Sequence, residues 1–167
     1  MRPGMGVTLN GIAQGFASDM VRQKLKQHGV RHALINTGEW SAIGLADAVR
    51  DWSLGIADPH QPDRLIARVQ MNGMCLATSA DDQCAFTSDR KHHHILDPLT
   101  GYSPPDIASV TIAASSCVTA DALTKVLFVA GYERALQLAT AWRVHALVIH
   151  KDGRSHASPA MSVLMDA

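Results

Sequence analysis

Apolar residues recur at the spacing of helical turns close to the N-terminus of the chain. This pattern predicts a helix over residues 11–28, because positions three or four apart share one face of an α-helix. Gly29 follows directly, and a glycine is common where a helix ends. The apolar positions are Ile12, Phe16, Met20, Val21 and Leu25.

Shorter apolar or alternating runs predict β-strands along much of the remaining chain. Residues 65–71 alternate and precede Asn72-Gly73, the strongest short signal for a hairpin, so residues 74–78 are expected to return beside them. Hairpins mixed with helices indicate an α+β fold with a mostly antiparallel sheet, in a single domain over residues 1–167. The other predicted elements are helices over 119–130 and 132–142 and strands over 31–36, 41–45, 52–57, 92–96, 108–114 and 144–150.

Composition and charge narrow the class of protein. Of the 167 residues, 47% are hydrophobic and 18% are charged, which is typical of a folded protein. Fifteen Lys and Arg balance fifteen Asp and Glu, and a net charge of zero disfavours a general nucleic-acid or anionic-membrane binder. No apolar run approaches the roughly 20 residues of a membrane span. The first residues also lack the apolar stretch of a signal peptide.

Three cysteines, Cys75, Cys84 and Cys117, stand far apart in the sequence. Their spacing contains no CxxC, which excludes a zinc ribbon and a thioredoxin motif. We expect three reduced, buried thiols, since a small number of separated cysteines does not form a disulfide framework.

Polar segments with small residues interrupt the apolar elements at three places in the first half of the chain. Residues 10–15 open the predicted helix, and Asn10 is a common N-cap residue. The free N–H groups at the start of a helix attract phosphate, so this segment is a candidate phosphate site. The alternative is that its glycines only allow the helix to pack closely. Residues 36–39 follow a predicted strand, where ligand-binding residues often lie, with a plain hairpin turn as the alternative. Residues 77–82, which include Ser79, offer hydroxyl groups for a ligand, although taken alone they favour a local turn.

Three consecutive histidines precede a tight turn that begins at Asp97. Neighbouring side chains of a strand point to opposite faces, so His92 and His94 would share one face and His93 would oppose them. The pair could hold a metal only with a further ligand from elsewhere. A histidine at a strand end, such as His94, also suits a general base near pH 7. Asp97 either binds a ligand or caps its own turn.

A polar group interrupts the apolar helix predicted over residues 119–130. Asp121, Thr124 and Lys125 fall on one face of this helix. A carboxylate beside a hydroxyl suits Mg²⁺ next to phosphates. The alternative is that Asp121 stabilises the first turn of the helix and forms a weak surface pair with Lys125.

Taken together and in this order, these segments resemble the ApbE family of flavin transferases (FAD:protein FMN transferases). The resemblance runs from about residue 7 to about residue 153 and is most specific in residues 94–101 and 120–123. The matching sequences are NGIAQG (10–15) with Asp19, NTGE (36–39), ATSA (77–80), HILDPLTG (94–101), SVTIAA (109–114) and ADALTKVLF (120–128).

The resemblance implies an ApbE-like, T-fold-like α+β fold that uses FAD as substrate. Members of the family transfer FMN to a Thr or Ser of an acceptor protein, with Mg²⁺, and release AMP. By the resemblance His94 would lie beside the flavin phosphates and act as the base, and Mg²⁺ would be held by Asp121, the main-chain carbonyl of Ala13 and the Thr124 hydroxyl. The residues expected to line the flavin site are Asn10, Gly11, Gln14, Asn36, Ser79, His94 and Asp97.

Several positions depart from the commoner family pattern, most seriously Lys125, which stands where the metal-binding Thr usually lies. The nearest hydroxyl, Thr124, comes one residue early, and one residue along a helix rotates a side chain by about 100°. Lys125 would therefore place an ammonium near the metal position, which would either remove Mg²⁺ dependence or abolish transfer. The other departures are Thr8, Asn10, Gln14, Glu39 and Ala80.

The resemblance covers only the C-terminal half of the usual family length. We therefore expect a fragment, a truncated product, or a protein that completes its site by self-association. The resemblance also implies an export signal, which is usual in the family, whereas the first residues of this sequence do not predict one, so the localisation stays open. Three functions stay open: a flavin transferase acting on FAD and an acceptor protein, a flavin-binding protein without transfer activity, and a non-catalytic half-domain.

Overall fold

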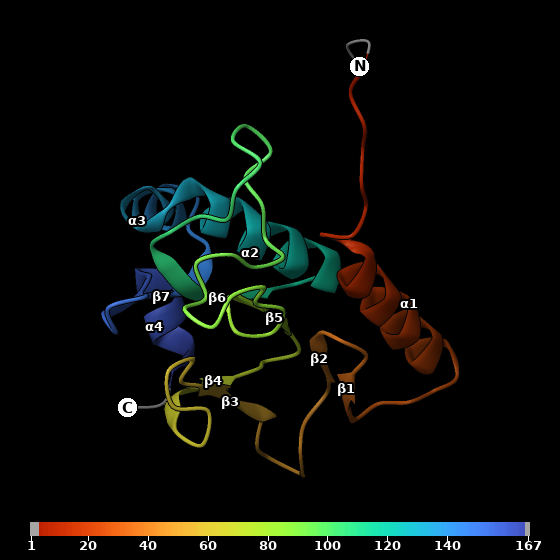
Figure 1. The fold of residues 1–167 in the computed structure, drawn as a ribbon. Coiled ribbons are helices and arrows are strands. Elements are labelled where there is room, and N and C mark those ends of the chain that lie inside the picture. The colour runs from red at the N-terminus through yellow and green to blue at the C-terminus, as the bar shows by residue number, and fades with distance from the viewer. Residues whose placement is uncertain (1–3, 166–167) are drawn as a thin grey trace.

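A six-stranded antiparallel sheet lies at the centre of the computed structural model, which describes residues 4–165 (Figure 1). The strands run in the order β1-β2-β5-β6-β7-β8, and each neighbouring pair is antiparallel. This arrangement confirms the mostly antiparallel α+β fold expected from the sequence. The strands are β1 (Ala33–Asn36), β2 (Trp40–Ile43), β5 (Cys75–Ala80), β6 (Ile107–Ala114), β7 (His145–His150) and β8 (Ser155–Ala157).

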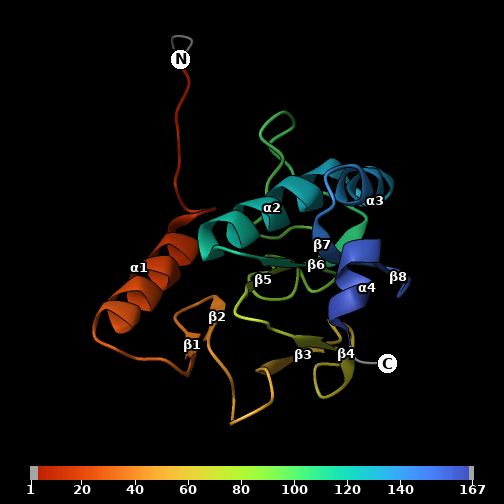
Figure 2. The ribbon, with the colours of Figure 1, turned by 180° about the vertical axis from the view of Figure 1, so that it is seen from behind.

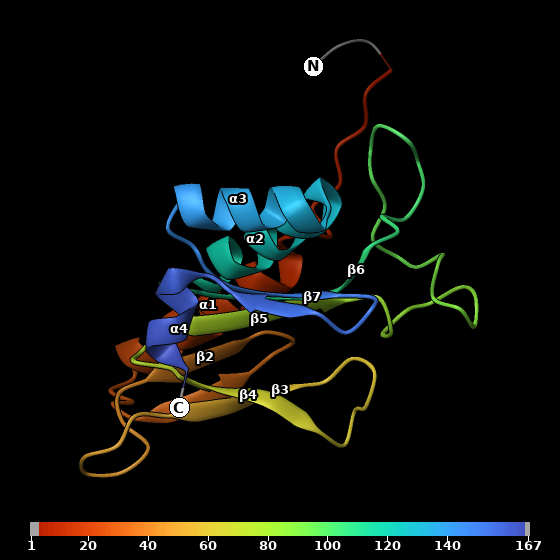
Figure 3. The ribbon, with the colours of Figure 1, turned by 90° about the vertical axis from the view of Figure 1, so that its left-hand side faces the viewer.

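Helices cover one face of this sheet, and a separate two-stranded hairpin lies across the other face (Figure 3). The covering helices are α1 (Ala13–Gln27), α2 (Cys117–Ala130) and α3 (Tyr132–Ala141). The hairpin consists of β3 (Ser53–Ala57) and β4 (Leu65–Gln70), and the short helix α4 (Pro159–Leu164) packs on β7 beside it (Figure 2). No helix among residues 4–165 is long and apolar enough to cross a membrane.

The core fills the space on both sides of β6, which is buried along nearly its whole length. Towards the helices, Val110 and Ile112 belong to a buried cluster with Leu127 and Phe128 of α2. Towards the hairpin, the buried cluster includes Val69 of β4 and Met161 of α4. Because β6 is covered on both faces, even its two polar residues, Ser109 and Thr111, are buried.

Local signals fix the ends of α2. The Ser116 hydroxyl accepts a hydrogen bond from the Thr119 N–H at 3.2 Å, so Ser116 is the N-cap and the helix begins two residues before the predicted start at Thr119. Gly131 ends the helix with φ +78°, a conformation that a side chain would strain. The Asp106 carboxylate then accepts from the Tyr132 N–H, which starts α3.

The first helix buries small residues, whereas three of the five predicted apolar positions are exposed and the other two, Ile12 and Leu25, are half-buried. Gly15 and Ser18 are buried against the rest of the molecule, while Phe16 and Met20 are 59% and 42% exposed. The prediction that Asn10 caps this helix is wrong: the N-cap is Ile12, and no side chain bonds there. The spacing of the apolar residues thus predicted the position of the helix correctly, but the face that carries most of them points to solvent rather than to the core.

Two strand predictions are wrong for non-local reasons. The Asn72-Gly73 turn exists, with φ +43° and +70°, but β4 before it pairs with β3, while β5 after it pairs with β2 and β6. Residues 92–96 form only an isolated antiparallel bridge, between His93 and Ala85, and the His93 N–H and carbonyl both bond the Ser103 hydroxyl. The elements that the sequence did not predict are β8 and α4.

Two further expectations need correction. Residues 77–80 continue β5 rather than forming a turn, so the Ser79 side chain is presented by the central sheet. Cys75 and Cys117 are buried and free, as expected, but Cys84 is exposed. Its exposure follows from its place in the irregular segment that connects β5 to β6.

Candidate functional site

A cavity of about 490 Å³ lies where the start of α1, the β1–β2 turn, β5 and α2 converge. Four of the predicted flavin-site residues line it: Asn10, Gln14, Ser79 and His94. Glu39, Gln83, Cys84 and Lys125 line it as well. The cavity therefore collects residues from segments that lie far apart in the sequence, and most of these residues have polar side chains.

Asp121 lies at the base of this region, where α1 crosses α2. Its side chain is 1% exposed, and its Oδ2 accepts a hydrogen bond from the Gly15 N–H at 2.9 Å. Its Oδ1 forms an ion pair with the Lys125 ammonium one helical turn later. Both carboxylate oxygens thus have partners from this chain, so Asp121 is a buried anion that is already neutralised.

Close packing around Gly15 makes this arrangement possible. A Cβ atom at Gly15 would lie 2.4 Å from the Cys117 carbonyl oxygen and 2.8 Å from the Asp121 Cβ. Only a glycine lets the α1 backbone approach α2 closely enough for the Gly15 N–H to reach the carboxylate. The short distances at Gly15 support the alternative that the glycines of residues 10–15 allow close packing. The close packing also places the Gly15 N–H within hydrogen-bond distance of Asp121.

The hydroxyl groups beside Asp121 bond one another. The Thr124 hydroxyl donates to the Asp121 carbonyl oxygen at 2.7 Å and lies 2.7 Å from the Ser79 hydroxyl. These contacts join α2 to β5 under the cavity wall. Gly11 lies beside the Lys125 side chain, since a Cβ at Gly11 would be 3.7 Å from Lys125 Cγ. Ala13, the third residue expected at a metal, is the first residue of α1.

Glu39 is the site residue whose role the sequence did not suggest, because it stood out only as a departure from a family pattern. It is 5% exposed and lines the cavity. Burial, followed by the negative charge of Asp121, raises the pKa of Glu39 from 4.5 to about 7, against the opposing effect of the Lys125 ammonium. A carboxyl group that is half protonated near neutral pH can take up or release a proton in the cavity.

The three histidines divide as their alternation predicts, although they do not lie on a strand. His93 is fully buried, with its ring 5.4 Å from that of Phe128, and burial lowers its pKa. His92 and His94 are exposed, and His94 alone of the three lines the cavity. Among residues 4–165 the only group of three or more metal-ligating side chains is Asp19, Cys75 and Cys117, so the histidine pair has no third ligand of these types.

Besides Gly11, the predicted flavin-site residues Asn36 and Asp97 do not line the cavity. The Asp97 carboxylate accepts from the Leu99 N–H at 2.8 Å and from the Thr100 hydroxyl at 3.3 Å, so this side chain caps its own turn. The Asn36 side chain accepts from the Gly38 N–H at 3.2 Å and holds the β1–β2 turn. Both residues stabilise loops at the site.

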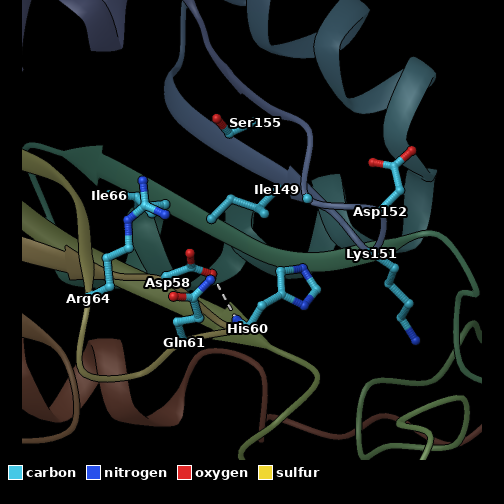
Figure 4. Close-up of a pocket in the computed structure, with 10 residues that line it drawn as sticks. Asp58, His60, Gln61, Arg64, Ile66, Ile149, Lys151, Asp152 and Ser155 are labelled. Carbon is cyan, nitrogen blue, oxygen red and sulfur yellow. Dashed lines mark hydrogen bonds between the residues drawn. The ribbon is translucent and has the colours of Figure 1, made fainter.

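A second cavity of about 370 Å³ lies between the β3–β4 loop and the β7–β8 turn (Figure 4). Asp58, His60, Arg64 and Lys151 are among its lining residues. The Asp58 carboxylate accepts from the His60 N–H at 2.8 Å, and the Lys151 ammonium donates to the Arg90 carbonyl at 2.7 Å. None of the predicted site residues lines this cavity, whereas four of them line the cavity beside Lys125, which is therefore the candidate site.

Comparison with known proteins gives consistent matches. The model of the ApbE family matches residues 1–148. The FAD:protein FMN transferase of Treponema pallidum (strain Nichols) is 38% identical over 168 residues, covering 93% of this chain and 46% of that protein. The FAD:protein FMN transferase of Klebsiella pneumoniae (strain 342) is 35% identical over 136 residues, covering 80% and 42%.

Solved structures show the same fold. The crystal structure of the ApbE protein of Thermotoga maritima MSB8 superposes with a TM-score of 0.90 at 30% identity, covering 99% of this chain and 55% of that chain. The flavin transferase ApbE from Vibrio cholerae superposes with a TM-score of 0.81 at 30% identity, covering 97% and 53%. The chain thus spans about half the length of the relatives it matches.

Proposed function

Because the chain belongs to the ApbE family, we propose that it binds FAD in the cavity beside Lys125 and transfers FMN to a hydroxyl group of an acceptor protein. The acceptor oxygen bonds to the phosphorus on the FMN side of the pyrophosphate. The P–O bond to the AMP side breaks, AMP leaves with that electron pair, and the hydroxyl proton passes to a base. The observation that carries the proposal is the convergence on one cavity of His94, Ser79 and Lys125, the last of which is paired with the buried Asp121.

His94 is the base in this proposal. It lines the cavity with an exposed side chain on the segment between β5 and β6, where an approaching hydroxyl group can reach it. A neutral imidazole accepts a proton near pH 7, and a positioned base contributes typically 10²–10⁴-fold to a rate. Glu39 shares the cavity, and its raised pKa of about 7 makes it a second group that can exchange a proton there.

The positive charge at the phosphates comes from Lys125 in this proposal. Mg²⁺ held by Asp121, Thr124 and Ala13 is the expectation from the family resemblance, but these residues as arranged do not fit the ion. The Lys125 ammonium takes Asp121 Oδ1, the Gly15 N–H takes Oδ2, and the Thr124 hydroxyl donates to a carbonyl. A side-chain ammonium, fixed by Asp121 beside the cavity, neutralises phosphate charge in place of a divalent ion.

The experiment measures FAD binding by flavin fluorescence and AMP release by chromatography, with water as acceptor, in Mg²⁺ and in EDTA. We expect the chain to bind FAD and to release AMP equally in both buffers. His94→Ala should slow AMP release by about 10²–10⁴-fold with FAD affinity retained. His92→Ala, an exposed neighbour outside the cavity, is the matched control and should leave both unchanged.

The variant Lys125→Thr distinguishes the Lys125 ammonium from Mg²⁺ as the source of positive charge at the phosphates. This variant removes the ammonium and places a hydroxyl one turn after Asp121, so we expect its AMP release to require Mg²⁺. Wild-type release that stops in EDTA would contradict the role of Lys125 and favour Mg²⁺. Binding of FAD without AMP release under any condition would identify a flavin-binding protein, and no binding would identify a non-catalytic half-domain.

A further inference from the structure

A second group of reactive side chains lies at the other end of the contact between α1 and α2. Cys75 of β5 and Cys117 of α2 are both fully buried, and their sulfur atoms are 2.6 Å apart. Asp19 of α1 completes the group: its Oδ1 accepts from the Cys117 N–H at 2.9 Å and lies 3.9 Å from the Cys75 sulfur. The flavin-transfer proposal makes no use of these side chains.

The two thiols are not equivalent. The guanidinium of Arg22 lies 3.5 Å from the Cys75 sulfur and is held in place by the carbonyls of Ser115 and Gly73. The hydrogen bond between the sulfurs lowers the pKa of Cys75 and raises that of Cys117. Cys75 is therefore the nucleophile of the pair, because a thiolate is the reactive form, and Cys117 supplies the second thiol.

A hollow on the surface leads towards the pair. Asp19 and Arg22 line this hollow, together with Gln23, Lys26 and Gln27 of the same helix. Since Asp19 and Arg22 also contact the sulfurs, a single layer of side chains separates the thiols from solvent. A small oxidant would reach the pair from the α1 side when these side chains move aside.

We propose that Cys75 and Cys117 form a dithiol–disulfide pair that a peroxide oxidises. The Cys75 thiolate attacks one peroxide oxygen, the O–O bond breaks, and protonation gives Cys75 sulfenic acid and one water. The Cys117 sulfur then attacks the Cys75 sulfur, a second water leaves, and the S–S bond forms. Two electrons pass from the dithiol to the peroxide, and an external dithiol returns the pair to the reduced form.

The surroundings favour a disulfide over a thiolate-bound metal ion. The Arg22 guanidinium already supplies positive charge next to Cys75, and a divalent ion bound to that sulfur would face it. Both Asp19 oxygens accept backbone N–H groups, from Cys117 and Val118, at 2.9 and 3.0 Å. Asp19 therefore serves the N-terminus of α2, where the helix dipole favours a carboxylate.

The disulfide would join β5 to the first turn of α2. The same two elements carry Ser79 and Thr124, whose hydroxyl groups meet under the candidate site. Oxidation would thus fix α2 against β5 at one end of the contact that supports the cavity. The proposal concerns the thiols themselves and stands whether or not the chain transfers flavin.

The test uses Cys84→Ser as the background, because Cys84 is the exposed thiol and would otherwise react. Reduced protein is treated with hydrogen peroxide, and free thiols are counted after denaturation while the intact mass is measured. We expect two thiols to be lost together with two hydrogen atoms, a peptide containing both cysteines after digestion, and full recovery with dithiothreitol. The cross-link spans 42 positions and should raise the Tm by roughly 5–10 °C.

Two further variants keep the outcome clear if one of them fails to fold. Cys75→Ala and Cys117→Ala, each in the Cys84→Ser background, should show no two-hydrogen loss and no peroxide-dependent rise in Tm. Two free thiols remaining in the background protein after peroxide would overturn the proposal. Stoichiometric zinc in the purified protein, protecting both thiols until a chelator is added, would also overturn it and identify a metal site.

Discussion

Glu39 brings a carboxyl group into a buried position where the charges of Asp121 and Lys125 both act on it. Its pKa rises to about 7, first because burial disfavours the charged form and then because Asp121 is negative. An unfolded chain would release the same proton near pH 4.5. The folded protein therefore holds one more proton than the unfolded chain between these two values, which links Glu39 to stability as well as to chemistry.

The stability contributed by Glu39 is fully present below about pH 4.5 and is lost as the pH rises through about 7. Glu39→Gln keeps a neutral side chain at every pH. Relative to the wild type, we expect this variant to change the free energy of unfolding by under about 1 kcal/mol at pH 5 and to raise it by up to about 3 kcal/mol at pH 8. Urea unfolding at both pH values measures the difference.

Glu133→Gln is the matched control, since Glu133 is exposed in the first turn of α3. Its effect on the free energy of unfolding should be the same at pH 5 and at pH 8. If Glu39→Gln behaves like this control, Glu39 is ionised in the folded protein at pH 5, and the buried-carboxyl interpretation is wrong.

Between elements, the contact of α1 with α2 determines what the site contains. The sequence predicted both helices, because helical spacing and the glycines that end them are local signals. It did not predict which face of α1 is buried. That choice depends on Asp19 accepting the N–H groups of residues about a hundred positions later, at the start of α2. A carboxylate that caps a distant helix has no local signature.

Strand pairing shows the same limit. Strands β4 and β5 were located by their composition and by the Asn72-Gly73 turn, but their partners are decided by packing. β5 is buried on the central sheet beside β6, whereas β4 pairs with β3 on a second layer. Of the candidate site, His94 and Ser79 were predicted from their motifs, whereas Glu39 was not, because burial of a turn residue requires the tertiary fold.

Gly15→Ala tests the helix contact. Helix propensity alone would stabilise α1 by about 1 kcal/mol. The added Cβ would lie 2.4 Å from the Cys117 carbonyl, so α1 must move away and the Gly15 N–H must leave Asp121. We expect a net loss of roughly 1–3 kcal/mol in the free energy of unfolding and weaker FAD binding.

The exposed Ala17 on the same helix provides the contrast. Ala17→Gly should lower the free energy of unfolding by about 1 kcal/mol through propensity alone, with FAD binding unchanged. A Gly15→Ala protein that is as stable as the wild type or more stable would show that α1 and α2 do not need this close approach.

At the scale of the whole molecule, a cluster of charged side chains around the buried Asp81 holds the irregular segment between β5 and β6 against the sheet. Asp81, with a side chain 3% exposed, lies at the start of this segment. The Lys151 ammonium, just after β7, lies 3.4 Å from its carboxylate, and the Arg90 guanidinium lies 3.7 Å away. Lys151 also donates to the Arg90 carbonyl at 2.7 Å. The segment that carries His94 is thus held at its midpoint as well as at its ends.

Asp81→Asn should release this segment. Removing the carboxylate leaves two cations together without their anion, and because both are partly exposed we expect a loss of about 1–3 kcal/mol rather than the larger cost of a fully buried pair. Amide exchange should accelerate over residues 85–103 while β6 stays protected, and AMP release should slow because His94 is no longer held in place. Asp89→Asn removes an exposed carboxylate from the same segment and should change neither property. Equal exchange in the two variants would mean that backbone bonds, such as that from the His94 N–H to the Cys84 carbonyl, hold the segment without Asp81.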